Sequence, residues 1–189
     1  MAVSSQIERR VTEMKISDKR YIENMRVKRS IQDALFSLME KKKFSEIRVS
    51  DIISVSGVAK ASYYRNFSSF EDIIYSYIDR MNNEIAQQMP HQHDTDISAM
   101  RQNLIVLYNY YLEHRKEILL LCSNGFYESI QDNTDQFLIN ALGDMPSKSM
   151  ERYNIFLLSG AICHVQIEWL KNKALESPEA FADFNIKFI

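Results

Sequence analysis

The sequence predicts an all-α protein in which a small N-terminal three-helix unit precedes a larger helical bundle. Gly and Pro are scarce, with 4 and 3 among 189 residues, so the turns of a β-sheet would be poorly supplied. Apolar residues recur at three- and four-residue spacing along most of the chain, which is typical of helices that bury one face. No apolar run reaches the roughly 18 residues of a membrane span, so we expect no membrane partner.

Charge is unevenly distributed along the chain. Residues 1–67 carry 14 Lys and Arg against 8 Asp and Glu, whereas residues 68–189 carry 9 against 17. The net charge of −2 therefore combines a first third of +6 with a remainder of −8. A basic head on an acidic body suits a protein whose N-terminal unit binds a polyanion. A solvated charged surface is the alternative interpretation.

The two cysteines and the N-terminal stretch both indicate the cellular compartment of the protein. Cys122 and Cys163 lie far apart in apolar surroundings, which predicts two buried free thiols in a reducing environment. The stretch from Met1 to Arg26 alternates polar and charged residues and lacks the apolar core of a secretory signal. We therefore expect a cytoplasmic protein.

The first elements follow from the apolar spacing. Residues 1–25 are polar and basic, and we expect a partly helical arm there. From Val27 the pattern tightens into a helix that ends at Lys41-Lys42-Lys43, where positive charge suits the helix dipole. Two short apolar segments follow, one ending at Gly57 and the other near Phe67. Each is about two turns long and must dock on the preceding helix to be stable. This arrangement describes a helix-turn-helix.

A long helix and a helical bundle are expected after this unit. Ser68 and Glu71 have the spacing of a capping box, and the helix that they begin should stop before Pro90. The apolar pattern of the remaining chain is interrupted at Gly125, Gly143, Pro146 and Pro178. The further helices are predicted over residues 97–113, 115–122, 125–142, 148–173 and 179–187.

The segment from Val58 to Phe67 fits a helix that enters a DNA major groove. Such a helix needs an apolar side clamped to the scaffold and a polar side that is free for base edges and phosphates. Tyr63 and Phe67 are expected to turn inward, while small Ala59 and Ala61 would let the backbone approach DNA. Val58 and, in part, Ala61 are also expected to turn inward. The side chains expected to face outward are Lys60, Ser62, Tyr64, Arg65 and Asn66.

Several motifs stand in a fixed order around this segment. They are Phe44-x-x-Ile47-x-Val49-x-Asp51-Ile52, then Ser56-Gly57-Val58, then Tyr63-Tyr64-Arg65-Asn66-Phe67, then Glu71-x-Ile73. Together they resemble the N-terminal domain of tetracycline-repressor (TetR/AcrR) family regulators, and the helix around residues 29–38 resembles the first helix of that family. Gly160-Ala161, Trp169-Leu170 and Ser177-Pro178-Glu179 resemble the C-terminal domain of a subgroup found mainly in Firmicutes.

The resemblance implies DNA contacts residue by residue. Tyr64 matches a position whose hydroxyl typically reaches a phosphate. The complete predicted DNA-binding set is Arg48, Ser50, Lys60, Ala61, Ser62, Tyr64, Arg65 and Asn66. Phe70 is a departure, because the family usually has a phosphate-contacting Lys there. That contact is either absent or supplied by the basic arm, whose candidates are Lys15, Lys19, Arg20, Arg26, Lys28 and Arg29.

Three parts are therefore expected: a basic N-terminal arm over 1–25, a helix-turn-helix domain over 26–70, and a helical dimerisation and ligand-binding domain over 71–189. The predicted dimer interface is a stripe on the penultimate helix, made of Tyr153, Phe156, Leu157, Gly160, Ala161, His164 and Glu168. Packing of this stripe within the monomer is the alternative. The predicted ligand pocket, for which plain core is the alternative, consists of Leu104, Tyr108, Tyr111, Phe126, Tyr127, Ile130 and Phe156.

No catalytic residue, metal or cofactor is predicted. His91 and His93 have no third ligand nearby, and the chain has neither the local context of a catalytic nucleophile nor a Gly-rich phosphate loop. The expected function is that of a homodimeric transcriptional regulator, a repressor that a small-molecule inducer releases from a palindromic DNA operator. The alternative is a coactivator of the same fold that docks on partner proteins and no longer reads DNA.

Overall fold

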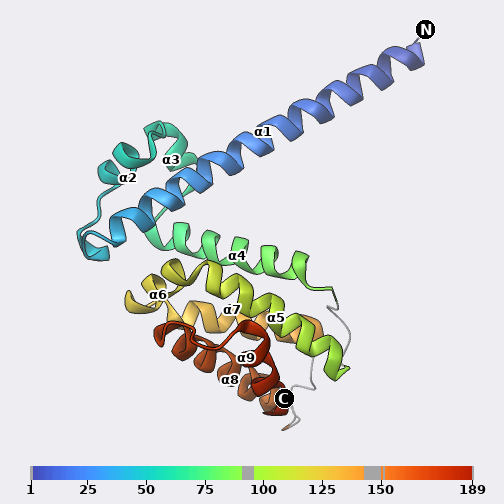
Figure 1. Cartoon of the computed structure of the whole chain (residues 1–189). Coiled ribbons are helices and arrows are strands. Elements are labelled where there is room, and N and C mark those ends of the chain that lie inside the picture. The colour runs from blue at the N-terminus through green and yellow to red at the C-terminus, as the bar shows by residue number, and fades with distance from the viewer. Residues whose placement is uncertain (1, 91–95, 143–149, 151, 189) are drawn as a thin grey trace. The chain divides into compact units, whose positions relative to one another are not determined.

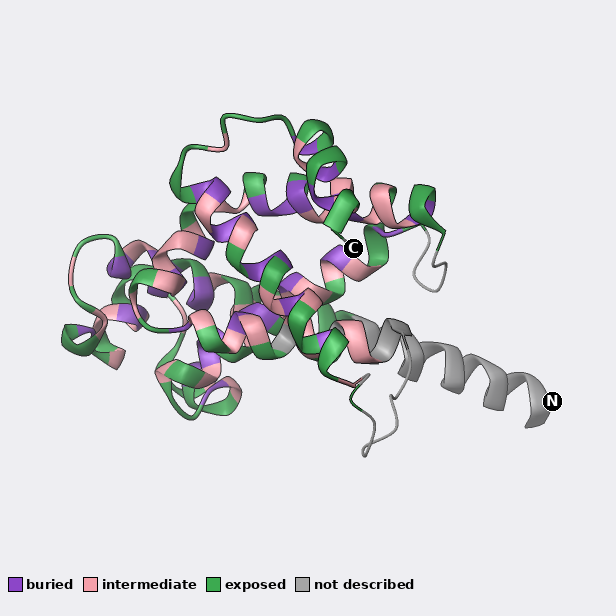
Figure 2. Ribbon diagram, turned by 90° about the horizontal axis from the view of Figure 1, so that it is seen from below, coloured by how far each residue is buried: buried purple, intermediate pink, exposed green. Residues whose placement is uncertain are grey.

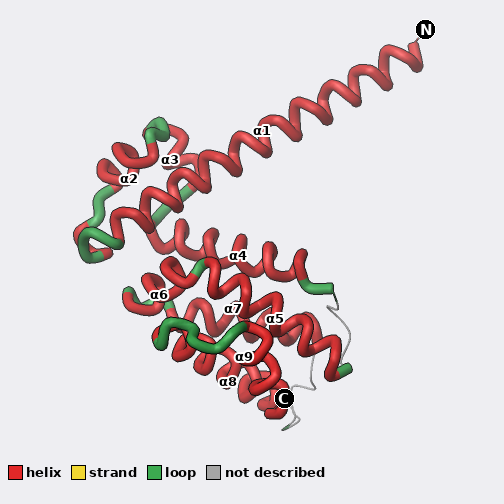
Figure 3. The backbone as a smooth tube through the Cα atoms, viewed as in Figure 1, coloured by secondary structure: helices red, strands yellow, loops and turns green. Residues whose placement is uncertain are grey.

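The computed structural model describes residues 2–90, 96–142, 150 and 152–188 (Figure 1). Within these ranges, the side chains of residues 2–18, 133, 137 and 140–142 are outside the description. Every regular element of the described chain is a helix and none is a strand, which confirms the predicted all-α fold (Figure 3). The chain divides into two compact units, Met1–Ile74 and Tyr75–Ile189.

The first helix is longer than the sequence predicted. In chain order, the first unit contains α1 (Ala2–Met39), the 3-10 helix η1 (Phe44–Glu46), α2 (Val49–Ser56), α3 (Lys60–Asn66) and the start of α4 (Phe70–Gln88). We expected a partly helical arm over residues 1–25, but α1 runs through this stretch without interruption (Figure 1). The absence of Gly and Pro between Ala2 and Met39 allows one continuous helix.

Helices α2 and α3 depend on α1 for their stability, because each is only 8 or 7 residues long. Ile31 and Leu35 of α1 are fully buried. Ile52 of α2 is also fully buried, while Tyr63 of α3 and Phe67 at its C-terminal end are each 2% exposed. Tyr63 and Phe67 lie one helical turn apart, so the same side of α3 carries both. The inward positions predicted for Tyr63 and Phe67 are confirmed, whereas Val58 is only half-buried and Ala61 is exposed, because they lie at or just before the start of this short helix.

A left-handed glycine makes the turn between α2 and α3. Gly57 has φ +67°, and its N–H donates to the carbonyl of Ile53 at 3.0 Å. A side chain at this φ would strain the backbone, whereas glycine adopts it freely. Gly57 therefore allows the tight turn between the two short helices.

The cap of α4 differs by one residue from the prediction. Ser69, rather than Ser68, accepts the capping hydrogen bond, which comes from the N–H of Asp72 at 3.1 Å. The Asp72 carboxylate reaches back to the N–H of Ser68 at 2.9 Å, so Glu71 is not the reciprocal partner. Both serines stand three residues before an acid. Phe70 begins the helix and packs edge-on against Phe44, with ring centroids 6.1 Å apart, which favours the later register.

The second unit is a bundle of helices whose bounds agree closely with the predicted ranges. Its members after α4 are α5 (Ile97–Glu113), α6 (Arg115–Ser123), α7 (Tyr127–Leu142), α8 (Arg152–Lys171), α9 (Pro178–Asn185) and the 3-10 helix η2 (Ile186–Phe188). Helix α8 packs against α7, α6 and α5, and α5 packs against α9. Buried and exposed residues alternate along these helices (Figure 2). None of the described helices has the length and apolar content needed to cross a membrane.

An aromatic cluster joins α5, α8 and α9. The rings of Trp169 and Phe181 are stacked, with centroids 4.8 Å apart and an interplanar angle of 12°. Tyr108 lies against Phe181, also with a centroid distance of 4.8 Å. The Trp169 indole N–H donates to the carbonyl of Glu176 at 3.1 Å, which fixes the segment that leads into α9.

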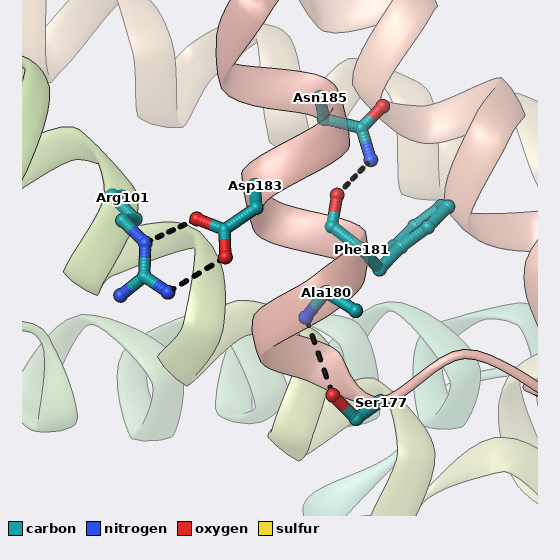
Figure 4. Close-up of polar contacts among 6 residues, drawn as sticks. All are labelled: Arg101, Ser177, Ala180, Phe181, Asp183 and Asn185. Atoms are coloured by element: carbon teal, nitrogen blue, oxygen red, sulfur yellow. Dashed lines mark hydrogen bonds and ion pairs between the residues drawn. The ribbon is translucent and has the colours of Figure 1, made fainter.

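Polar contacts fix α9 at its start and along its length (Figure 4). Ser177 caps its start by accepting from the N–H of Ala180 at 3.2 Å. Arg101 of α5 binds Asp183 through two nitrogens, with the Nη2–Oδ2 distance at 3.0 Å. This pair links the N-terminal half of α5 to the C-terminal half of α9, so the C-terminal helix is part of the bundle.

Substitution of two adjacent tyrosines tests which side of α3 is buried and which is exposed. We expect Tyr63→Ala to lower the free energy of unfolding of the first unit by about 3–5 kcal/mol, because it removes a buried ring. The neighbouring Tyr64 is 57% exposed, so Tyr64→Ala should cost about 1 kcal/mol or less. Urea unfolding followed by circular dichroism measures both values. Equal losses would contradict the assignment.

Candidate functional site

The outward side of α3 is exposed, while its inward side is clamped. Lys60, Ala61, Tyr64 and Arg65 are all exposed. The Tyr64 ring meets the buried Tyr63 ring edge-on, with centroids 5.3 Å apart and an interplanar angle of 86°. The exposed ring is therefore positioned by the buried one. Burial raises the pKa of Tyr63, which keeps that phenol protonated at neutral pH.

Asn66 differs from the other predicted DNA-binding residues because its amide is engaged within the unit. Its Nδ2 donates to the carbonyl of Ser62 at 2.8 Å, and its Oδ1 accepts from the Asn24 amide of α1 at 2.8 Å. The second bond ties the end of α3 to α1. The Ser62 hydroxyl, in turn, accepts from Arg65 Nη2 at 3.2 Å. Asn66 thus acts as a scaffold residue in this structure, and its contact with DNA stays a prediction.

Arg48 and Ser50 are both exposed at the start of α2, as the family resemblance requires. The Asp51 carboxylate accepts from the backbone N–H of Arg48 at 2.9 Å and forms an ion pair with Lys42. The Lys42 ammonium is the main cause that holds the pKa of Asp51 below its ordinary value. Sequence reasoning missed this pair, although an acid three residues into a predicted helix was the available signal. Within the lysine run, Lys42 therefore stabilises the start of α2.

Both α3 and α1 carry basic side chains. Lys60 and Arg65 are the charged residues of α3, and no acid accompanies them. On α1, Lys19, Arg20, Arg26 and Arg29 are exposed and Lys28 is half-buried; the side chain of Lys15 lies outside the described residues. The Lys28 ammonium lies 5.9 Å from the centroid of the Phe67 ring. The described part of the first unit thus offers cations at a polar helix face, which is the chemistry that phosphates and base edges require.

The predicted stripe on α8 is largely exposed. Tyr153, Phe156 and Leu157 are 49%, 47% and 76% exposed, Ala161 and His164 are exposed, and Gly160 and Glu168 are half-buried. A Cβ added at Gly160 would meet no atom within 4 Å, so nothing in this chain's described residues requires glycine there. Glu168 accepts from Lys171 Nζ at 2.8 Å. An exposed apolar stripe is typical of a surface that another protein covers.

The predicted pocket residues lie mostly in the interior of the second unit. Those that are buried are Leu104, Tyr108, Tyr111, Phe126 and Ile130. Tyr127 is half-buried, and Phe156 belongs by its exposure to the α8 stripe. Tyr108 is a member of the aromatic cluster. The prediction of a pocket stays a prediction.

Sequence reasoning missed a polar layer between α7 and α8. Gln131 Nε2 donates to the Ser159 hydroxyl at 2.7 Å, and that hydroxyl also contacts the Asp135 carboxylate. The Cys163 thiol donates to the Thr134 hydroxyl at 3.1 Å. The signal was present, because Ser159 falls at an inward position of the helical pattern of α8.

Cys122 and Cys163 were predicted to be buried free thiols, and His91 and His93 were predicted not to hold a metal. Both cysteines are free, and burial raises the pKa of each thiol to about 11; Cys163 is buried, whereas Cys122 is only half-buried. His91 and His93 lie outside the described residues. The described residues contain no group of three or more side chains that could hold a metal ion.

Comparisons with known proteins identify the fold. No family model and no curated protein matches the chain. Several solved structures are similar to it, and three of them are described here. A TetR transcriptional regulator from Streptococcus agalactiae 2603V is 14% identical, and the match covers 91% of this chain and 98% of that one with a TM-score of 0.62. The dihydroxyacetone kinase operon activator DhaS is 17% identical, with 86% of this chain and 93% of that one covered and a TM-score of 0.59. The fatty acid degradation regulator FadR from Bacillus halodurans is 16% identical, with 85% of this chain and 93% of that one covered and a TM-score of 0.58. The chain therefore has the fold of TetR-type regulators.

Proposed function

We propose that this protein is a sequence-specific, DNA-binding transcriptional regulator whose α3 enters the major groove. The observation that carries the proposal is the division of α3 into two sides. Tyr63 and Phe67 are buried against the scaffold, while Lys60, Tyr64 and Arg65 are exposed. A helix fixed on one side and polar on the other can present the same side chains to successive base pairs.

The exposed groups are suited to different parts of DNA. Lys60 and Arg65 supply cations, and the Tyr64 hydroxyl supplies a donor for a phosphate oxygen. Arg48 and Ser50 stand at the start of α2, where the family makes phosphate or base contacts. Because cations supply much of this interaction, binding should weaken steeply as the salt concentration rises.

We also propose that two copies pair through the stripe on α8 and bind an approximately palindromic operator. Exposed Phe156 and Leu157, and the open space above Gly160, support this part. Two-fold symmetry of a dimer would place two copies of α3 in successive major grooves. The half-sites should then lie about one helical turn of DNA apart.

The regulatory part of the proposal is repression that a small-molecule inducer relieves. Such an inducer would bind in the second unit and change operator affinity through α4, which belongs to both units. The structural neighbours include one protein whose name describes an operon activator and another named as a regulator of fatty acid degradation. A reporter gene placed behind the operator measures the sign of regulation.

One observation favours a second candidate function. Phe70, which replaces the family's phosphate-contacting Lys, is half-buried and packs against Phe44. A coactivator that docks on a partner protein would not need this phosphate contact. The exposed Lys60 and Arg65 favour DNA, and direct binding measurements separate the two functions.

A double substitution on α3 tests the DNA-binding function. We expect Tyr64→Ala/Arg65→Ala to weaken binding to the operator by about 10-fold or more, because each side chain contributes to affinity through phosphates or bases. Fluorescence anisotropy with the DNA upstream of the gene measures this, at several salt concentrations and beside an unrelated duplex. Phe184→Ala/Lys187→Ala is the matched control, since it removes an exposed aromatic ring and an exposed lysine from the second unit. Weak binding that is equal for both duplexes and unchanged by the α3 substitutions would favour the coactivator.

A charge placed in the α8 stripe tests the dimer. We expect Leu157→Glu to convert the dimer into a monomer at micromolar concentration, because two buried carboxylates would face each other across the two-fold axis. Leu175→Glu is the control, since Leu175 is 81% exposed and lies outside the stripe. Analytical ultracentrifugation measures the mass of each variant. A Leu157→Glu protein that keeps the mass of the unmodified one would exclude this interface.

A further inference from the structure

The end of α3 is held from the side by residues of α1. The Nδ2 of Asn24 donates to the Oδ1 of Asn66 at 2.8 Å, although the two residues are 42 positions apart in the chain. Lys28, one turn further along α1, places its ammonium 5.9 Å from the centroid of the Phe67 ring. Two successive turns of α1 thus contact the last residue of α3 and the residue that follows it.

The direction of the hydrogen bond between Asn24 and Asn66 follows from the second contact of Asn66. Its amide also lies 2.8 Å from the backbone carbonyl of Ser62, which can only accept, so the amide nitrogen must face that carbonyl. The amide oxygen of Asn66 is then directed at α1, where only a donor can satisfy it. The Asn24 amide supplies this donor, and an apolar side chain at the same position would not.

The place of Asn66 on α3 distinguishes this bond from the packing of the two buried rings. Tyr63 and Phe67 are one turn apart, so they fix α3 along a single line. Contact along one line opposes rotation of a helix about that line only weakly. Asn66 precedes Phe67 by one residue, which is about 100° around the helix, so its bond lies to the side of the line and opposes the rotation.

Rotation of α3 would move the groups that are proposed to meet DNA. Arg65 Nη2 donates to the Ser62 hydroxyl at 3.2 Å, so Ser62 connects Arg65 with Asn66. Hydrogen bonds to base edges weaken steeply when donor and acceptor are misaligned, whereas attraction to phosphates does not depend on the base sequence. Loss of the bond from α1 should therefore reduce sequence discrimination more than it reduces overall affinity.

We propose that Asn24 is a positioning residue for sequence recognition, which fixes the rotation of α3 through Asn66 and so directs Arg65 toward the base edges. Asn24 lies on α1, outside the two short helices of the helix-turn-helix, and the role requires no contact of its own with DNA. The inference rests on the proposed function, because it concerns how the same helix reads DNA.

Asn24→Leu tests the proposal, because it keeps a similar volume and removes the donor without changing the charge. The probes are a duplex that the unmodified protein enriches from a randomised pool and a duplex of the same bases in scrambled order, both measured by fluorescence anisotropy. We expect the ratio of the two affinities to fall by about 3- to 10-fold, as for one lost hydrogen bond. The affinity for the scrambled duplex should stay within about 2-fold, whereas a unit that merely unfolds would lose both affinities together. An unchanged ratio would overturn the proposal.

Two further variants show whether the effect passes through Asn66. In an Asn66→Ala protein the acceptor is already absent, so adding Asn24→Leu should lower the ratio no further. Asn83→Leu makes the same substitution at an exposed position of α4 and should keep the ratio of the unmodified protein. The proposal is wrong if Asn24→Leu lowers the ratio equally with and without Asn66, or if Asn83→Leu lowers it as much.

The outcome for the proposed function is read from the unmodified protein. If this protein prefers the enriched duplex and Asn24→Leu keeps that preference, the inference fails and the DNA-reading function stands. If the unmodified protein enriches no sequence at all, the DNA-reading function fails, and the inference fails with it because there is no discrimination to position.

Discussion

The function proposed for the first unit depends on the burial of Tyr63 and Phe67 against α1. A helix of 7 residues has no stability of its own, so α3 exists only because these two aromatic side chains dock on the scaffold. Once they are fixed, Arg65 lies on the opposite side of the helix, and Lys60 and Tyr64 remain exposed. The packing that folds the unit is therefore also the packing that orients its polar surface.

Helix α8 has an equally clear division in the second unit. Its outward side carries Phe156 and Leu157, which remain exposed in the single chain. Its inward side carries Cys163, Gln166 and Trp169, which lie in the interior of the bundle. One helix thus connects the surface proposed for pairing with the interior of the second unit, the unit in which an inducer is proposed to bind. A molecule that changes the packing of the inward side acts on the same rigid element that would hold the partner.

Local sequence signals predicted most of the helices. Helices α5 and α6 lie almost where the periodicity placed them, because His114 and Gly125 fall at breaks in otherwise regular apolar patterns. The start of α4 was off by one residue, because Ser68 and Ser69 each precede an acid by three positions and only the contact of Phe70 with Phe44 distinguishes them. The length of α1 was underestimated, since a polar stretch without Gly or Pro carries no periodic signal even when it is helical.

The sequence does not predict which side chains meet across the fold. Asn24 and Asn66 are 42 positions apart, and no local pattern indicates that their amides meet. Asn66 therefore read as an outward residue of α3, although its amide joins two helices.

The central claim is that the exposed side of α3 reads DNA sequence. Selection of duplexes from a randomised pool, followed by sequencing of those retained by the protein, tests this claim even while the operator is unidentified. The account predicts enrichment of an inverted repeat by the unmodified protein and none by the variant that lacks the Tyr64 and Arg65 side chains. Retention of an unenriched pool by both proteins, or the same enriched sequences with both, would contradict it.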